Sequence, residues 1–179
     1  PGAVSWRCIT TNNAFIAVRN METNNIYGWE TASGTLQSTG SFTADPNNID
    51  THLMKNTEWG AVAYLSRSSY GKNSEEIYIN NSTDYNTGCS GTTASAAPAG
   101  GCANAYNSTN GVKASSTGNV YGIYDLSGCA WEKVAAYVDN GQTTQGSSIA
   151  TADGKYKDKY TVGNPDNQST NYGLTSTKT

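Results

Sequence analysis

Few side chains in this sequence could carry out acid–base or nucleophilic chemistry. The chain contains one histidine, His52, whereas a nucleophilic triad needs a histidine base beside both a nucleophile and an orienting acid. The paired carboxylates are Glu75 and Glu76, which are adjacent and would point to opposite faces of an extended segment. No phosphate-binding glycine loop is present. We therefore expect no catalytic residue in this chain, and we expect His52 to be a structural hydrogen-bonding residue.

The four cysteines, Cys8, Cys89, Cys102 and Cys129, allow three disulfide pairings and lack the Cys-x-x-Cys spacing of a zinc site. Cys89 and Cys102 flank a Gly-, Ala-, Ser- and Thr-rich stretch that cannot fold by itself. Closing a loop of ~15 residues contributes about 3 kcal/mol in the chain-entropy model. We predict the pairs Cys89–Cys102 and Cys8–Cys129, and hence an oxidising compartment. The alternative is four buried free thiols in a cytosolic protein.

The composition indicates one extracellular domain spanning residues 1–179. Charged residues make up 14% of the chain, against roughly 25% in a typical soluble domain, and Asn, Ser, Thr, Gly and Tyr replace them. Such surfaces are common in extracellular proteins and carbohydrate binders; the alternative is a loop-rich protein with no ligand. The net charge of −3 without a basic cluster argues against nucleic-acid binding. No apolar run approaches the ~18 residues of a membrane span.

Two helices are predicted. The first starts at Thr11 or Asn12, with an Asn/Thr N-cap and one apolar face (Ala14, Phe15, Val18, Met21), and stops at Asn24–Asn25 and Gly28. The second has Thr57 as its N-cap, Glu58 in its first turn, Arg67 near its end and Gly71 as its stop. Its packed stripe should be Trp59, Val62, Ala63 and Ser66. A short strand is predicted over 76–80, where apolar residues alternate.

Most of the remaining chain is predicted to be turn or loop. Residues 31–50 should cross the surface as a loop, and Asn110–Gly111 should form a tight turn. After a turn at 139–141, residues 142–154 should be a polar linker, and the charged run 155–160 a solvated short helix or turn. Residues 163–179 have almost no apolar content and should be loop-like.

The segment from Gly118 to Val138 is the one around which the chain should be organised. Its apolar residues are interrupted by Gly118, Gly122 and Gly128, which is too broken for a helix and too glycine-rich for a regular strand. We expect a rigid turn with positive φ or close backbone approach at the glycines, followed by an extended run over 130–138. Trp131, Val134 and Tyr137 or Val138 should be buried, as should Trp59.

Residues 119–132, Asn-Val-Tyr-Gly-Ile-Tyr-Asp-Leu-Ser-Gly-Cys-Ala-Trp-Glu, resemble the signature of the formylglycine-generating-enzyme (sulfatase-modifying factor) family, which has a C-type-lectin-like fold. Residues 48–65 together with this motif are similar to pilin-associated surface proteins of gut Firmicutes, over nearly the whole chain. The resemblance implies an α+β domain with two short helices, a small antiparallel sheet and much loop. The family's terminal motifs are absent, so we expect the chain to be truncated at both ends, within a longer precursor.

The resemblance also implies a function outside the cell. We expect a non-catalytic adhesin or filament-associated module that binds a glycan or a surface protein and needs no cofactor. The family's calcium site would correspond to Gly128, Ala130 and Glu132, next to Cys129, which replaces the family's usual Asn. The reactive cysteines of the family would lie beyond this chain. The alternatives are a formylglycine-generating oxidase domain and a purely structural filament subunit.

Overall fold

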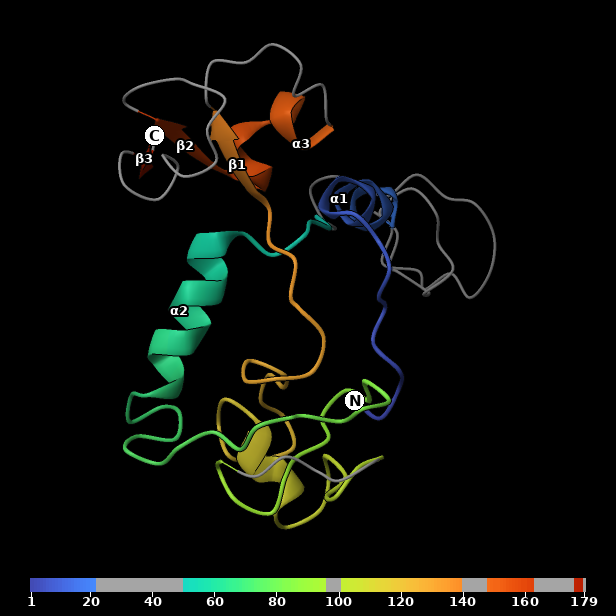
Figure 1. The fold of residues 1–179 in the computed structure, drawn as a ribbon. Helices are drawn as coiled ribbons and strands as arrows, with labels where there is room; N and C mark the ends of the chain where they lie inside the picture. Colours follow the sequence, from blue (N-terminus) through green and yellow to red (C-terminus); the bar gives the residue numbers. More distant parts are fainter. Residues whose placement is uncertain (22–49, 96–100, 140–147, 163–175, 179) are drawn as a thin grey trace, which may run out of the picture. The chain divides into compact units, whose positions relative to one another are not determined.

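The computed structural model describes residues 1–21, 50–95, 101–139, 148–162 and 176–178 (Figure 1). The chain divides into two compact units built from discontinuous segments: unit 1 comprises residues 1–8 and 58–132, and unit 2 comprises residues 9–57 and 133–179. Helices and short strands occur with much irregular chain, which confirms the mixed α/β class. The predictions for residues 22–49, including the end of the first helix and the surface loop, and for the turn at 139–141 beyond Asp139, lie outside the described residues.

The first helix of unit 2, α1 (Thr11–Asn20), forms as predicted. Thr10 is its N-cap, with a side-chain oxygen that accepts a hydrogen bond from the Asn13 amide. Ala14 and Phe15 are buried. Phe15 packs in a small core with Ala135 and Ile149, which Leu53, Ala152 and Tyr156 flank. The amphipathic pattern therefore located both the helix and the side that faces the core of this unit.

The sheet of unit 2 is mixed, so the predicted antiparallel sheet is wrong in its first pairing. Strand β1 (Ala136–Asp139) pairs in parallel with β2 (Asp158–Val162), and β2 pairs antiparallel with β3 (Ser176–Lys178). Parallel neighbours need a crossover connection, and here the connection contains the helical turn α3 (Ser148–Thr151) and the 3-10 turn η2 (Gly154–Tyr156). Figure 1 shows β1 beside β2, with α3 in the connection.

Three predictions for the C-terminal part are corrected by these elements. Residues 148–151 are helical rather than linker, the run 155–160 contains most of strand β2, and residues 176–178 form a strand rather than loop. The prediction for the charged run holds at its start, where Lys155 and Tyr156 belong to the 3-10 turn η2 and Lys155 is exposed, but Lys157 and Asp158 are buried. The Lys157 ammonium donates to the carbonyl of Ala150, and this local partner offsets the cost of burying the charge.

Helix α2 (Asn56–Ser66) begins two residues before Glu58, the first helical residue implied by the predicted N-cap, and its first turn is bonded by a side chain distant in sequence. The Asp158 carboxylate accepts the Thr57 amide at 2.6 Å and the Thr57 hydroxyl at 3.1 Å. Thr57 thus lies inside the helix and is not its N-cap. A carboxylate at this end satisfies an otherwise unbonded amide and complements the helix dipole. The helix ends at Ser66, before the predicted stop at Gly71.

We predict that Asp158→Ala lowers the free energy of unfolding by about 1–3 kcal/mol, because it removes both bonds to the first turn of α2. Urea denaturation followed by circular dichroism would measure the loss. Asp84→Ala, a change at an exposed carboxylate, is the matched control and should shift stability by less than about 0.5 kcal/mol. Equal stability of the two variants would contradict the role given to Asp158.

Unit 1 is mostly irregular chain held together by isolated contacts. Residues 76–80 do not form the predicted strand; only Asn80 makes a β-bridge, with Gly128. Asn110 is in a turn as predicted, but Gly111 starts the short 3-10 helix η1 (Gly111–Ala114). Alternating apolar residues favour a strand only where a neighbouring strand supplies a ladder of hydrogen bonds, and here the neighbouring segments supply single bridges.

The predicted Cys89–Cys102 disulfide is present, with its Cα atoms 5.2 Å apart. Cys89 is almost fully buried, and Ser90 and Asn104 beside the bridge exchange backbone hydrogen bonds of 3.1 Å in both directions. The disulfide closes the stretch whose composition provides little order of its own. The inference from loop composition to a covalent cross-link was therefore correct.

Asn80 connects three parts of unit 1 and is fully buried. Its amide nitrogen donates to the carbonyl of Asn86 and to the carboxylate of Asp125, both at 2.7 Å. Its backbone accepts from Cys129 and donates to Ser127 at 2.8 Å. Asn80 itself is away from bulk water, and its partners are half-buried, so that a lost hydrogen bond is only partly replaced by one to water.

The position of Asn80 explains why residue 128 is a glycine. Its φ is +89°, and a Cβ atom there would overlap the carbonyl oxygen of Asn80. Both the left-handed backbone and the close approach require glycine. The predicted positive φ is also confirmed at Gly118, whose φ is +71°.

We predict that Asn80→Ala lowers the free energy of unfolding by about 2–3 kcal/mol, because the Asp125 carboxylate and the Asn86 carbonyl each lose a buried donor. Thermal and urea unfolding would test this. Asn81→Ala, at the exposed neighbouring asparagine, provides the control of identical chemistry. If both variants unfolded at the same urea concentration, Asn80 would not be the connecting residue described above.

Candidate functional site

The sequence predicted the central segment as the most rigid part of the chain, and its backbone contacts agree. Asp125 and Cys129 adopt positive φ of 68° although neither is glycine. The Asp125 carboxylate accepts the Gly88 amide as well as the Asn80 side chain. Tyr124 is buried, and its hydroxyl donates to the carbonyl of Tyr106 at 2.9 Å. These bonds hold the segment in a conformation that its residues would not adopt alone.

The prediction that Trp131 is buried is wrong, because 94% of its surface is exposed. The prediction assumed regular alternation along residues 130–138, but strand β1 begins only at Ala136. The residues before it are irregular, and the buried position among them is Ala135, whose amide donates to the Met54 carbonyl at 2.8 Å. Val134, Tyr137 and Val138 are half-buried.

Trp59 is half-buried rather than fully buried, and it contacts the end of the central segment. Its indole N–H donates to the carboxylate of Glu132. Partial burial raises the pKa of the Glu132 carboxyl, the hydrogen bond from Trp59 opposes that rise, and the charge of Asp125 adds to it. The two segments that carried the family resemblance are therefore joined by this pair within unit 1.

The donors predicted for calcium do not form an evident cation site. Glu132 is engaged by Trp59, and the nearby Asp125 carboxylate is engaged by Asn80 and Gly88. Across the described ranges no three His, Cys, Asp or Glu side chains are grouped to hold a metal ion. Calcium binding through Gly128, Ala130 and Glu132 stays a prediction, and no function is derived from it below.

Cys8 and Cys129 are free thiols in the structure, so the predicted second disulfide is not formed there. Cys8 is exposed, whereas the Cys129 sulfur lies 3.1 Å from the hydroxyl of Ser5. The pair was predicted only because these two cysteines remained after Cys89 and Cys102 were paired, and no geometric observation supported it.

The residues considered for catalysis are dispersed. His52 is half-buried in unit 2, with its ring centroid 6.3 Å from that of Tyr156. Glu76 pairs with Arg67 at 3.1 Å, and Glu75 lies 3.8 Å from the Lys72 ammonium. Each glutamate therefore has its own cation in the described structure, and the two do not form a carboxylate pair.

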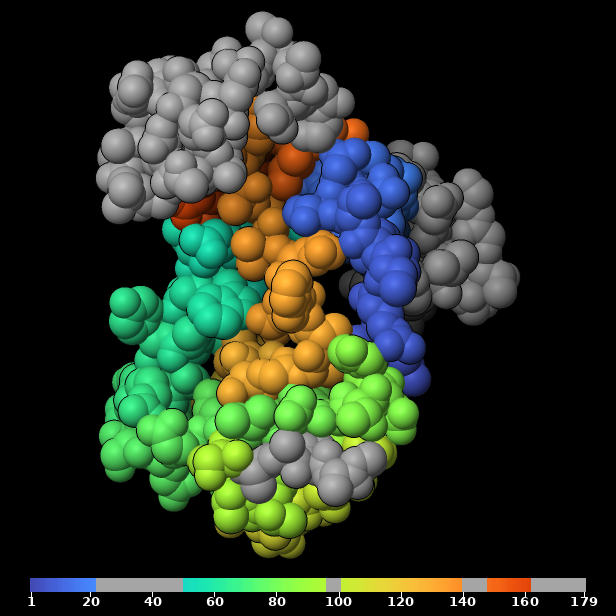
Figure 2. All heavy atoms as spheres, viewed as in Figure 1, coloured from blue at the N-terminus to red at the C-terminus, as the bar shows by residue number. Residues whose placement is uncertain are grey.

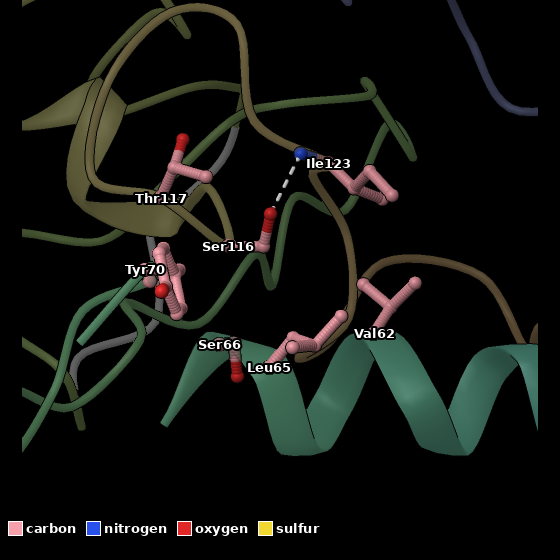
Figure 3. Close-up of a pocket in the computed structure, with 8 residues that line it drawn as sticks. Val62, Leu65, Ser66, Tyr70, Ser116, Thr117 and Ile123 are labelled. Carbon is pink, nitrogen blue, oxygen red and sulfur yellow. Dashed lines mark hydrogen bonds between the residues drawn. The ribbon is translucent and has the colours of Figure 1, made fainter. Parts of the chain in front are cut away.

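Unit 1 contains a hollow of about 220 Å³ between the C-terminal half of α2 and residues 116–123 (Figure 3). It is lined by side chains from three stretches: Val62, Leu65, Ser66, Tyr70, Gly71, Ser116, Thr117 and Ile123. In Figure 3, Val62 and Leu65 extend from the helix toward Ile123. Sequence reasoning identified the helix and the motif but not the hollow between them.

Two serine hydroxyl groups of this hollow are bonded within the protein, and one threonine hydroxyl is not. Ser66 Oγ donates to the Ala63 carbonyl at 2.6 Å, and Ser116 Oγ accepts the Ile123 amide at 3.0 Å. Thr117 Oγ1 is buried without a hydrogen-bond partner. The surface left to a ligand is therefore mainly hydrocarbon, with the phenol ring of Tyr70 at its side.

Nine large apolar residues are exposed in the described part of the chain. Among the described residues they all belong to unit 1: Val4, Trp6, Tyr64, Leu65, Tyr70, Val120, Tyr121, Ile123 and Trp131. Leu65, Tyr70 and Ile123 line the hollow itself, and Tyr70 is 84% exposed. Contiguous apolar surface on a soluble protein marks an interaction site. The sequence signal was available, because α2 carries a single charge among its eleven residues.

Comparisons with protein-family models, with curated proteins and with solved structures find no match to this chain. Within the described part of the chain, none of the helices has both the length and the apolar character needed to cross a membrane.

We predict that Trp131→Ala changes the free energy of unfolding by less than about 0.5 kcal/mol, because the side chain has little contact to lose. Trp59→Ala should cost about 1–3 kcal/mol, since it removes half-buried packing and leaves Glu132 without its donor. Chemical denaturation of both variants tests this contrast. A loss at Trp131 as large as that at Trp59 would be the contrary result.

Proposed function

We propose that this protein is a non-catalytic binding module of the C-type-lectin/formylglycine-generating-enzyme type, acting outside the cell or at its surface. The observation that carries the proposal is the apolar hollow beside α2, with Leu65, Tyr70 and Ile123 exposed along it. The Cys89–Cys102 disulfide supports an oxidising compartment. The resemblance of residues 119–132 to the family signature supports the fold assignment.

Binding is favoured over catalysis by the placement of the reactive side chains. A catalytic site needs a nucleophile, a base and an orienting group within hydrogen-bond reach of one another. His52, Glu75 and Glu76 have separate structural neighbours, and none of them lines the hollow. The hollow offers hydrocarbon, two serine hydroxyls that are already bonded and one threonine hydroxyl with no base beside it among the lining residues, and these can hold a ligand without activating it.

The chemistry of the hollow favours a protein ligand over a glycan. A sugar stacks its C–H groups on an aromatic ring, and Tyr70 provides such a ring. However, a sugar has several hydroxyls that each need a donor or acceptor, whereas the Ser66 and Ser116 hydroxyls are engaged internally and Thr117 Oγ1 is the buried hydroxyl of the hollow without a partner. A volume of about 220 Å³ with apolar walls accommodates an apolar side chain of a partner protein. Glycan recognition is kept as an outcome of the test.

We predict that Tyr70→Ala weakens ligand binding at least about tenfold without changing the melting temperature, because exposed aromatic residues at an apolar site dominate its affinity. Biolayer interferometry with immobilised mucin glycoprotein, intact and enzymatically deglycosylated, is the assay. Tyr121→Ala, an equally exposed tyrosine outside the hollow, is the control. Equal binding to both mucin forms indicates the protein backbone as ligand, whereas loss on deglycosylation indicates the glycan. Identical affinities of the two tyrosine variants would exclude the hollow as the site.

The oxidase alternative is tested separately. The full chain is incubated under aerobic conditions with a cysteine-containing sulfatase-type peptide, with copper or calcium added, and peptide mass is monitored. We expect no change in mass, and conversion of the cysteine to an aldehyde would replace the binding proposal with the enzyme. The structural-subunit alternative shares the apolar surface but needs no ligand other than a neighbouring subunit.

A further inference from the structure

Thr117 lines the hollow beside α2, and its hydroxyl has no hydrogen-bond partner in the described structure. Its Oγ1 atom is buried, so bulk water does not supply the missing bond. A buried hydroxyl without a partner costs free energy, and most buried polar groups in folded proteins are bonded. A ligand that provides the missing hydrogen bond would remove this cost, and the hollow is where such a ligand would lie.

The Thr117 hydroxyl can turn into the hollow without losing a bond. In Figure 3 it points away from Val62 and Leu65 of α2. There it lies against Gly122, where a Cβ atom would overlap Oγ1. No hydrogen bond fixes this rotamer, and rotation about the Cα–Cβ bond exchanges the positions of the methyl and hydroxyl groups. A ligand in the hollow can therefore bond to Oγ1 at little cost.

The other polar groups of the walls are bonded within the protein or face water. The Ser66 and Ser116 hydroxyls are engaged internally, and Tyr70 is 84% exposed. None of the eight residues that line the hollow is charged. A charged ligand group would lose its hydration there without meeting an opposite charge. The walls therefore match a hydrocarbon group that carries one uncharged hydrogen-bonding atom.

We propose that the hollow receives a tyrosine side chain of a partner protein, with the phenol hydroxyl hydrogen-bonded to Thr117 Oγ1. Both hydroxyls can donate and accept. The phenol hydroxyl is at the tip of its side chain, the part that enters a hollow first. Tryptophan carries its N–H at the side of a wider ring, and leucine or phenylalanine has no polar side-chain atom. The tyrosine would occupy the site proposed above, so its binding rests on the function proposed for the hollow.

The hollow has room for this ring. An apolar cavity of roughly 150 Å³ holds benzene, and the hollow measures about 220 Å³. Tyr70 at its side supplies an aromatic ring for an edge-to-face or offset contact with the phenol. Leu65 and Tyr70 are both exposed, so a partner can reach the hollow from solvent. Figure 2 shows α2, coloured teal to green, at the surface of the molecule in that view.

Two compounds that differ by one hydroxyl group test the proposal on the full chain: N-acetyltyrosinamide and N-acetylphenylalaninamide. Each is titrated to about 20 mM, because a single side chain gives a dissociation constant on the order of 1 mM. Binding is followed by NMR through the methyl signals of Val62, Leu65 and Ile123. We expect the tyrosine compound to bind about three- to tenfold more tightly, the factor that one net hydrogen bond supplies.

Thr117→Val replaces the hydroxyl by a methyl group of similar shape and should abolish this preference. Thr109→Val, the same change at an exposed threonine outside the hollow, should keep it. The melting temperature of Thr117→Val should not fall, because the substitution removes no hydrogen bond. This second measurement also shows that the variant is folded.

The outcomes separate a wrong residue type from a wrong site. If neither compound shifts the methyl signals, the hollow is not a ligand site and the function proposed for it fails as well. Equal affinity for the two compounds, or a preference that Thr117→Val retains, would leave the hollow as a site and overturn the tyrosine assignment. A lower melting temperature of Thr117→Val would show that the hydroxyl is already bonded in the free protein, which also overturns the assignment.

Discussion

The structure of unit 1 depends on the buried amide of Asn80. It bonds to the Asn86 carbonyl and the Asp125 carboxylate, while the backbone of Asn80 pairs with the central segment at Ser127 and Cys129. Unit 1 has almost no regular secondary structure outside α2, so side-chain hydrogen bonds replace the ladders that hold most folds together. The low charge content agrees with this arrangement, because neutral amides and hydroxyls satisfy buried backbone groups without the desolvation cost of ions.

Unit 2 has a small sheet and buries two neighbouring charged residues, each with a dedicated partner. Asp158 bonds to the first turn of α2, and the Lys157 ammonium bonds to the Ala150 carbonyl. Both residues belong to a charged run that composition alone would place in solvent. Their burial couples strand β2 to the start of α2 and to α3, which explains why a short three-stranded sheet with few apolar residues is sufficient for this unit.

We propose that the function depends on apolar surface that stays exposed in the folded protein. Charged residues are few in this chain, so uncharged polar residues make up most of its polar surface. The exposed tyrosine and aliphatic side chains differ from that surface in being apolar, which is typical of interaction sites. Helix α2 contributes Val62 and Leu65 to this surface, because its apolar residues are not confined to a single buried stripe.

The sequence by itself determined the features that depend on local chemistry. Helix α1 and its cap followed from periodicity, the Cys89–Cys102 bridge from loop composition, and the left-handed glycines 118 and 128 from the broken apolar pattern. Only the tertiary structure decided which side chains are buried. Trp131 is exposed and Asp158 is buried, against expectation, because burial depends on contacts distant in sequence, such as the one between Asp158 and Thr57. The hollow was not predictable for the same reason. Its walls come from three separate stretches of the chain, and their spacing in the sequence does not indicate that they lie close together in the fold.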